Sequence, residues 1–286
     1  MISVFANFKI NSSYRLNCLK NSLLSFNDRR IVNWVINIKG KYKLEASRFL
    51  KENIKSPINI SYLESKKGWM YDSKEIAIKL KGKYVFFWFE DHICLKNKKN
   101  YFFNCIKSLN ENNIDQMLYS FWHNGNYLRG LKNLNYKKKK YLTFYTINNR
   151  NLSIIQNNRK KLNLDKIGFL INGTSVFKKK FFLKILFTRK PFLRRYNKML
   201  PFDFEKRIND NYWLPIKHAV PNKEIFASID DDHGENGYSL ISRGIYKAKN
   251  RRKEEIKIRE KELKIKNFLF RNNYFISKFK KLTNQI

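Results

Sequence analysis

The first ninety or so residues alternate between short, almost uninterrupted apolar runs and segments whose apolar residues recur at helical spacing. The apolar runs predict strands at residues 2–8, 31–38, 58–63 and 84–89. Strands that alternate with helices form βαβ units, which give a mostly parallel sheet with right-handed crossovers. Because such apolar strands must be covered on both faces, we expect helices on either side of the sheet. Ligands of these sheets bind beyond the carboxyl ends of the strands, so we expect a site at that edge.

Three helices are expected between these strands. Ser12 or Ser13 caps the first, whose apolar positions, at helical spacing, are Leu16, Leu19, Leu23 and Leu24. The second covers residues 42–53, with its inward positions at Leu44, Phe49 and Leu50. The third is capped by Asp72 or Ser73, runs through Leu80 and stops before Gly82.

The periodicity is weaker beyond residue 90. We expect a helix at residues 100–112 and strands or extended segments at 115–122, 167–177, 211–218 and 224–229. Residues 124–141 are rich in Lys and Asn and poorly periodic, which predicts a loop. Glu and Lys interleaved at helical spacing predict a charged helix at 246–266.

The chain has 286 residues and a formal net charge of +37. Lys, Asn, Ile, Phe and Tyr have A/T-rich codons, so the base composition of a genome accounts for part of this excess. The charge is also uneven, because residues 132–201 hold 19 Lys or Arg and a single acid, Asp165. Such a surface suits phospholipid headgroups, a charged glycan or a nucleic acid. Without a signal peptide or an apolar run of ~20 residues, we expect a cytoplasmic protein with peripheral contact to an anionic membrane through its basic tail.

One segment joins a buried strand directly to chemically active side chains. Residues 84–89 are apolar, and Glu90, Asp91 and His92 follow at once. Carboxylates at the carboxyl end of a strand can hold a hard divalent cation such as Mg²⁺ or Mn²⁺. That cation would neutralise a diphosphate and make it a better leaving group. The alternative is a solvated loop after a core strand.

In order and spacing, these elements resemble the GT-A glycosyltransferases, especially the family-2-like ones. A first strand leads into a helix with a Leu-rich face, Gly68 precedes a helix, and a Tyr-Val-Phe-Phe strand ends in acids. The resemblance covers residues 1–122 well and the remainder loosely. It implies an α/β fold with a GT-A-like, mostly parallel sheet flanked by helices. The nucleotide-sugar half would cover residues 1–122, the acceptor half 123–245, and a basic helical extension 246–286.

The resemblance also implies roles for single residues. It places contacts to the nucleotide-sugar donor at Asn7, Asn37, Gly68, Asp72 and Glu90. Asn37 stands where the family often has an acid for the base, so the nucleotide is not indicated.

The metal site departs from the family pattern, because Glu90-Asp91-His92 replaces Asp-x-Asp. Asp91 aligns with the metal-binding acid, and His92 is either a second ligand or only a neighbour. The expected cofactor is Mn²⁺ or Mg²⁺.

Two later clusters complete the predicted site. Asp203 and Glu205 lie where the family places the general base that takes the proton from the acceptor hydroxyl. The alternative for them is the acidic start of a helix. Asp232 and His233, in an acidic run closed by Gly234, are candidates for further metal ligands. The alternative for this run is a loop that solvates itself.

We therefore expect a metal-assisted, inverting glycosyltransferase that moves a sugar from a nucleotide-sugar donor to a glycan or glycolipid acceptor. One competing hypothesis is a basic nucleic-acid-binding, ribosome-associated protein from an A/T-rich genome. The basic segments favour it, but no RRM or KH signature is present. Another is a GT-A domain without catalysis that serves as a scaffold, which His92 in the acidic triplet suggests.

Overall fold

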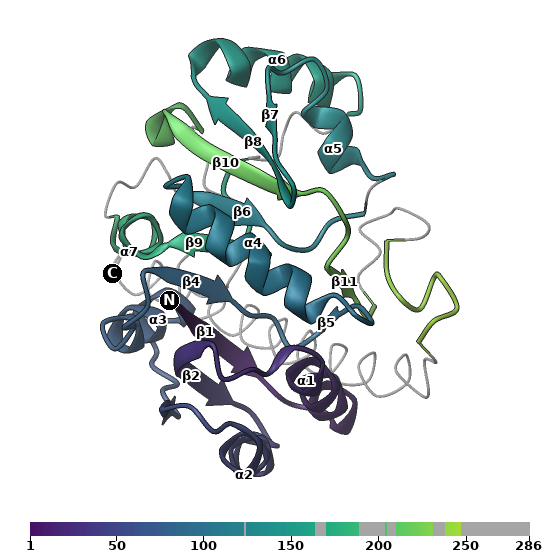
Figure 1. Ribbon diagram of the computed structural model, residues 1–286. Coiled ribbons are helices and arrows are strands. Elements are labelled where there is room, and N and C mark those ends of the chain that lie inside the picture. The colour runs from purple at the N-terminus through teal and green to yellow at the C-terminus, as the bar shows by residue number, and fades with distance from the viewer. Residues whose placement is uncertain (123, 164–169, 189–203, 205–209, 231–237, 247–286) are drawn as a thin grey trace, which may run out of the picture. The chain divides into compact units, whose positions relative to one another are not determined.

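The computed structural model describes residues 1–122, 124–163, 170–188, 204, 210–230 and 238–246. Met1–Tyr246 form one compact unit (Figure 1), and Lys247–Ile286 form a second. Apart from Tyr246, the helix predicted at 246–266 lies outside the described residues. Within the described part, no helix is both long and apolar enough to cross a bilayer.

A nine-stranded mixed sheet runs through the first unit. Its strands are, in spatial order, β3 (Ile58–Ser61), β2 (Ile31–Lys39), β1 (Ile2–Lys9), β4 (Tyr84–Phe87), β9 (Ser175–Lys178), β6 (Gln116–Leu118), β10 (Ile216–Pro221), β8 (Leu142–Ile147) and β7 (Lys137–Lys138). The four strands from the first ninety residues are parallel neighbours, as their apolar runs predict. β9 is antiparallel to both β4 and β6, and β8 is antiparallel to β10 and β7.

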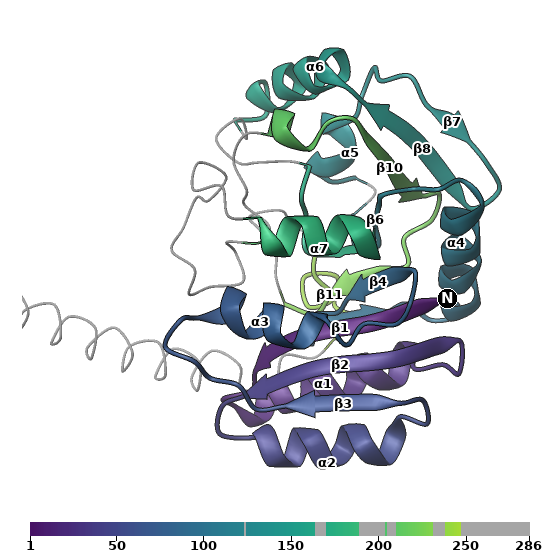
Figure 2. The ribbon, with the colours of Figure 1, turned by 90° about the vertical axis from the view of Figure 1, so that its left-hand side faces the viewer.

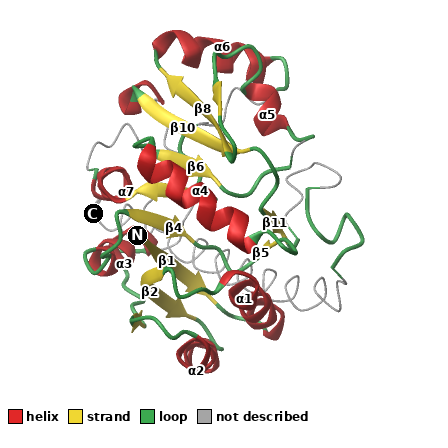
Figure 3. Cartoon of the chain, in the orientation of Figure 1, coloured by secondary structure: helices red, strands yellow, loops and turns green. Residues whose placement is uncertain are grey.

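Helices cover both faces of the sheet (Figures 2 and 3), because each strand sends alternate side chains to opposite sides. One core holds Val4 and Phe86 together with α1 (Ser13–Phe26), α2 (Lys43–Asn53) and α4 (Lys99–Glu111). The other holds Phe5 and Phe87 together with α3 (Trp69–Ala77), α5 (Asn126–Gly130), α6 (Asn149–Lys160) and α7 (Lys179–Phe187). The α/β class with helices on both faces is therefore confirmed for the described residues.

Some local predictions for the first ninety residues are wrong. Leu44 was expected inward, yet it is exposed. Leu24, an apolar position of the first helix, is exposed as well. α3 begins at Trp69 after Gly68, so neither Asp72 nor Ser73 is its cap, and it ends at Ala77. Gly82 does not end a helix but lets the chain pass close to β1, since a Cβ there would lie 2.5 Å from the amide nitrogen of Ser3.

Beyond residue 90, the predicted loop at 124–141 contains α5 and the short strand β7. The strand predicted at 115–122 is confined to Gln116–Leu118, and a 3-10 helix, Asp210–Trp213, precedes β10. β8, α6, α7 and the short strand β5 (His92–Cys94) were not predicted. β5 pairs with β11 (Phe226–Ser228) in a separate two-stranded sheet, so that Ser228 lies opposite His92.

Candidate active site

The candidate site lies at the edge where the parallel strands β1, β2, β3 and β4 end. Glu90 and Asp91 follow β4, and the chain leaving β1 turns directly into α1. Ser12 caps α1 by accepting a hydrogen bond from the amide of Arg15, as predicted. Arg15 therefore sits in the first turn of α1, next to the acids that follow β4.

Arg15 binds both acids. Its Nη1 lies 3.0 Å from Oδ2 of Asp91 and 3.4 Å from Oε1 of Glu90. The other oxygen of Asp91 lies 2.8 Å from Nδ1 of His92. The Asp91 carboxylate thus joins a guanidinium and an imidazole, and Arg15, Glu90 and Asp91 keep less than a quarter of their side-chain surface exposed.

The pKa values of the two neighbouring carboxyl groups are shifted in opposite directions. Burial raises the pKa of Glu90 to about 7; Asp91 adds to this rise, and Arg15 opposes it. Burial also disfavours the charged form of Asp91, but the charge and hydrogen bond of His92, followed by those of Arg15, hold its pKa well below the usual range. Asp91 is therefore ionised at neutral pH, whereas Glu90 exchanges a proton there.

The β5–β11 pair brings the start of the second acidic cluster to the same place. The amide of Ile229 donates a hydrogen bond of 2.7 Å to the Asp91 carbonyl. The next residue, Asp230, is buried and accepts a 3.0 Å hydrogen bond from the hydroxyl of Tyr14 in α1. Tyr14, Arg15 and Asp230 were not predicted as site residues, although Tyr14 and Arg15 open the helix that follows β1 and so had to lie at this edge.

The predicted donor contacts Asn7 and Asn37 lie side by side on β1 and β2. Asn37 donates to Oδ1 of Asn7 and to the Leu63 carbonyl, and its own Oδ1 accepts from the Leu63 amide. Asn7 in turn donates to Ser73, and its carbonyl accepts from the indole of Trp69. These amides hold the strand ends and α3 together, so a role toward the donor would come in addition to that structural role.

Besides Glu90, two further predicted contacts to the nucleotide-sugar donor, Gly68 and Asp72, lie at the start of α3. Gly68 has a φ of 91° and a ψ of −177°, a conformation that is open to glycine almost alone. Asp72 is fully buried, pairs with the Lys39 ammonium and accepts from the Ser65 amide. The structure thus gathers Asn7, Asn37, Gly68 and Asp72 around the ends of β1 and β2, and Glu90 and Asp91 after β4.

The side-chain oxygens that could bind a metal ion at this site suit a hard cation. Glu90 and Asp91 supply carboxylate oxygens, although no three His, Cys, Asp or Glu side chains form a ligand group among the residues that the structure describes. Mg²⁺ is commonly held by one or two carboxylates together with substrate phosphates and waters. The site therefore fits a cation that arrives with a diphosphate, and Arg15 lies against the same carboxylates that such a cation would use.

Four predicted residues lie outside the described part: Asp203, Glu205, Asp232 and His233. Phe204, which stands between the two candidate bases in the sequence, is described and fully buried. Its ring lies 5.1 Å from that of Phe87 at the end of β4 and 6.5 Å from that of Trp69 at the start of α3.

Comparison with known proteins agrees with this arrangement at the level of the fold. No protein-family model matches the chain, and no curated protein matches it by sequence. The crystal structure of residues 1–349 of S. aureus TarS matches with a TM-score of 0.50 and 17% identity, over 79% of this chain and 60% of that one. The same fragment in complex with UDP-GlcNAc gives a TM-score of 0.47 and 16% identity, over 79% and 57%. The chain therefore spans about three fifths of the TarS fragment, and its resemblance to the family-2-like GT-A glycosyltransferases is confirmed as a similarity of fold.

Proposed function

We propose that the protein is a glycosyltransferase that moves a sugar from a nucleotide-sugar donor to a glycan or glycolipid acceptor. The observation that carries this proposal is the group formed by Glu90, Asp91 and Arg15 at the strand edge of a GT-A-like sheet. Ligands of open α/β sheets bind at this edge. TarS, which shares the fold, has been crystallised with UDP-GlcNAc and with UDP.

In this proposal, Asp91 would hold Mn²⁺ or Mg²⁺, which would supply positive charge to the diphosphate that leaves the sugar. Its low pKa keeps Asp91 charged for that role. Glu90, the neighbour of Asp91, would accept a hydrogen bond from the ribose or from a metal-bound water. Asp203 or Glu205 takes the proton from the acceptor hydroxyl, which gives an inverting displacement at the anomeric carbon.

Calorimetric titration with UDP, GDP, CDP and ADP, each with and without Mn²⁺, tests the proposal. We expect one of them to bind at least about tenfold more tightly with Mn²⁺. Asp91→Asn should remove that dependence because it removes the carboxylate charge. Asp28→Asn is the matched control: Asp28 also pairs with an arginine, Arg30 at 2.7 Å, but precedes β2 at the opposite edge of the sheet. Equal binding with and without metal would count against the metal-assisted site, and the absence of any nucleotide binding would overturn the function.

A further inference from the structure

Arg15 differs from the other cation at the carboxyl edge of the strands in how far it is enclosed. Its side chain keeps 23% of its surface exposed, whereas Lys39 keeps 11% and pairs with an Asp72 that keeps 1%. Lys39 is therefore fixed in place by a buried carboxylate. The guanidinium of Arg15 reaches solvent on a flexible stem, so a ligand can approach it and offer it a second anionic partner.

The Asp91 carboxylate does not depend on Arg15 alone for its position. Its Oδ1 lies 2.8 Å from Nδ1 of His92, and Arg15 contacts the other oxygen. His92 is buried and begins β5, whose pairing with β11 places it opposite Ser228. The imidazole therefore keeps hold of Asp91 when the guanidinium leaves, and the site tolerates an exchange of its cation.

Arg15 and a metal ion would use the same carboxylate oxygens. Nη1 of Arg15 lies 3.0 Å from Oδ2 of Asp91 and 3.4 Å from Oε1 of Glu90. A divalent cation that bridges a carboxylate and a phosphate keeps their oxygens within roughly 3–4 Å of each other, because each metal–oxygen distance is about 2.1 Å. A diphosphate that binds with the cation would thus arrive within reach of the guanidinium that the cation displaces.

The start of α1 also favours an anion beside Arg15. A guanidinium binds a phosphate through two parallel hydrogen bonds, at least as well as it binds a carboxylate. The first turn of α1 contains no acidic residue, and the N-terminal end of a helix attracts negative charge. A phosphate beside Arg15 would therefore meet no repelling carboxylate from α1 itself.

We propose that Arg15 is a binding residue for the diphosphate of the donor, and that it exchanges Asp91 and Glu90 for phosphate oxygens when the donor binds. This inference rests on the proposed transferase function and adds a regulation of the same site. Without the donor, Arg15 covers the carboxylates, and a metal ion would have to displace it. Once Arg15 is on the diphosphate, the carboxylates are open. Arg15 thereby makes donor and metal strengthen the binding of each other, by the same factor in both directions.

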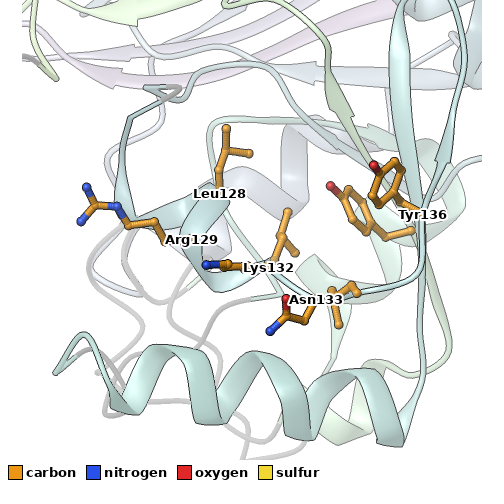
Figure 4. Close-up of a pocket in the computed structure, with 8 residues that line it drawn as sticks. Leu128, Arg129, Lys132, Asn133 and Tyr136 are labelled. Atoms are coloured by element: carbon orange, nitrogen blue, oxygen red, sulfur yellow. The ribbon is translucent and has the colours of Figure 1, made fainter.

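A second group of exposed cations supplies the matched control. Arg129 and Lys132 line a pocket of about 410 Å³ beside α5 (Figure 4). Tyr145 of β8 lines it as well, and β8 is four strands away from β4 in the sheet. No acid is among the residues that line this pocket, so it offers no carboxylate for a cation to share with a phosphate. Arg129→Gln therefore removes the same charge as Arg15→Gln without touching the site.

Calorimetric titration of the full chain with UDP, GDP, CDP and ADP, at zero and at saturating Mn²⁺, tests the exchange. For the nucleotide that binds most tightly, Arg15→Gln should weaken binding at saturating Mn²⁺ by about tenfold. The ratio of the dissociation constants without and with Mn²⁺ should also fall several-fold, because Arg15 no longer competes with the metal. Arg15→Lys, which keeps the charge, should lose less affinity than Arg15→Gln. Arg129→Gln should change neither quantity.

Three results would overturn the exchange: an unchanged affinity of Arg15→Gln at saturating Mn²⁺, an unchanged ratio, or equal losses in Arg15→Gln and Arg129→Gln. A purely structural role of Arg15 gives the unchanged ratio, since a loosened α1 weakens nucleotide binding equally with and without metal. A wild type that binds none of the four nucleotides would remove the transferase function and this inference together. A wild type that binds one of them with Mn²⁺, while Arg15→Gln behaves identically, would remove the exchange alone.

Discussion

The Arg15 guanidinium pairs with the Asp91 carboxylate to which a metal ion would bind. Arg15 binds both Asp91 and Glu90. We therefore predict that Arg15→Gln increases the affinity for Mn²⁺ in the absence of nucleotide by several-fold, because two neighbouring carboxylates lose their competing charge. Electron paramagnetic resonance of free Mn²⁺ measures this directly. Arg30→Gln, which releases Asp28 at the opposite edge, is the control, and an unchanged or lower Mn²⁺ affinity in Arg15→Gln would show that Arg15 does not compete.

Single residues of the site were predictable only as far as the strand order was. Asp91 was predicted because an apolar strand runs straight into it. Arg15 was not: its place in the helix after β1 indicates this edge of the sheet, but its contact with the acids after β4 depends on β1 and β4 being neighbours. Asn7 and Asn37 were named as donor contacts, yet their hydrogen bonds to each other, to Leu63 and to Ser73 depend on long-range pairing that a local pattern does not contain.

Among the elements, α3 depends most on one backbone conformation. Gly68 starts the helix at a φ of 91° and a ψ of −177°, which a residue with a Cβ adopts only at a cost of about 1–3 kcal/mol. We predict that Gly68→Ala lowers the free energy of unfolding by about that amount and weakens nucleotide binding, because Trp69 and Ser73 anchor Asn7. Urea denaturation and calorimetry measure the two effects. Gly244→Ala is the comparison. Its φ of 68° also disfavours a Cβ, but this φ lies in the left-handed region that residues with a Cβ can adopt, and an added Cβ meets no atom within 4 Å, so the substitution should cost less. Equal costs would refute this role of Gly68.

The elements of the first ninety residues were predictable because their strands are apolar on both faces and their helices are amphipathic. The second half lacks those signals. The segment at 124–141 has the Lys and Asn content of a loop, yet it forms α5 and β7 against the core of its neighbours. α6 buries only Leu152, Ile155 and Arg159, a stripe too sparse to predict from the sequence. Tertiary packing, rather than local propensity, decides these elements.

For the molecule as a whole, the stability of the fold depends on pH through a buried histidine, His218, in the half of the sheet with antiparallel strands. His218 on β10 is buried, and its Nε2 lies 2.8 Å from the Tyr127 hydroxyl of α5. Burial lowers the pKa of His218 to about 3. In the unfolded chain its pKa is about 6.5, so between these values the unfolded state binds the extra proton. The stability that neutral His218 contributes is therefore complete above about pH 6.5 and is lost as the pH falls toward about 3.

We predict that, from pH 7 to pH 5, the wild type loses about 2 kcal/mol more unfolding free energy than His218→Gln. Urea denaturation of both proteins at each pH measures this. Glu90 acts in the opposite direction: its raised pKa makes the folded state bind the extra proton as the pH falls through about 7. That contribution is common to both proteins and cancels in the difference, so parallel losses in wild type and variant would show that His218 is not held neutral by the fold.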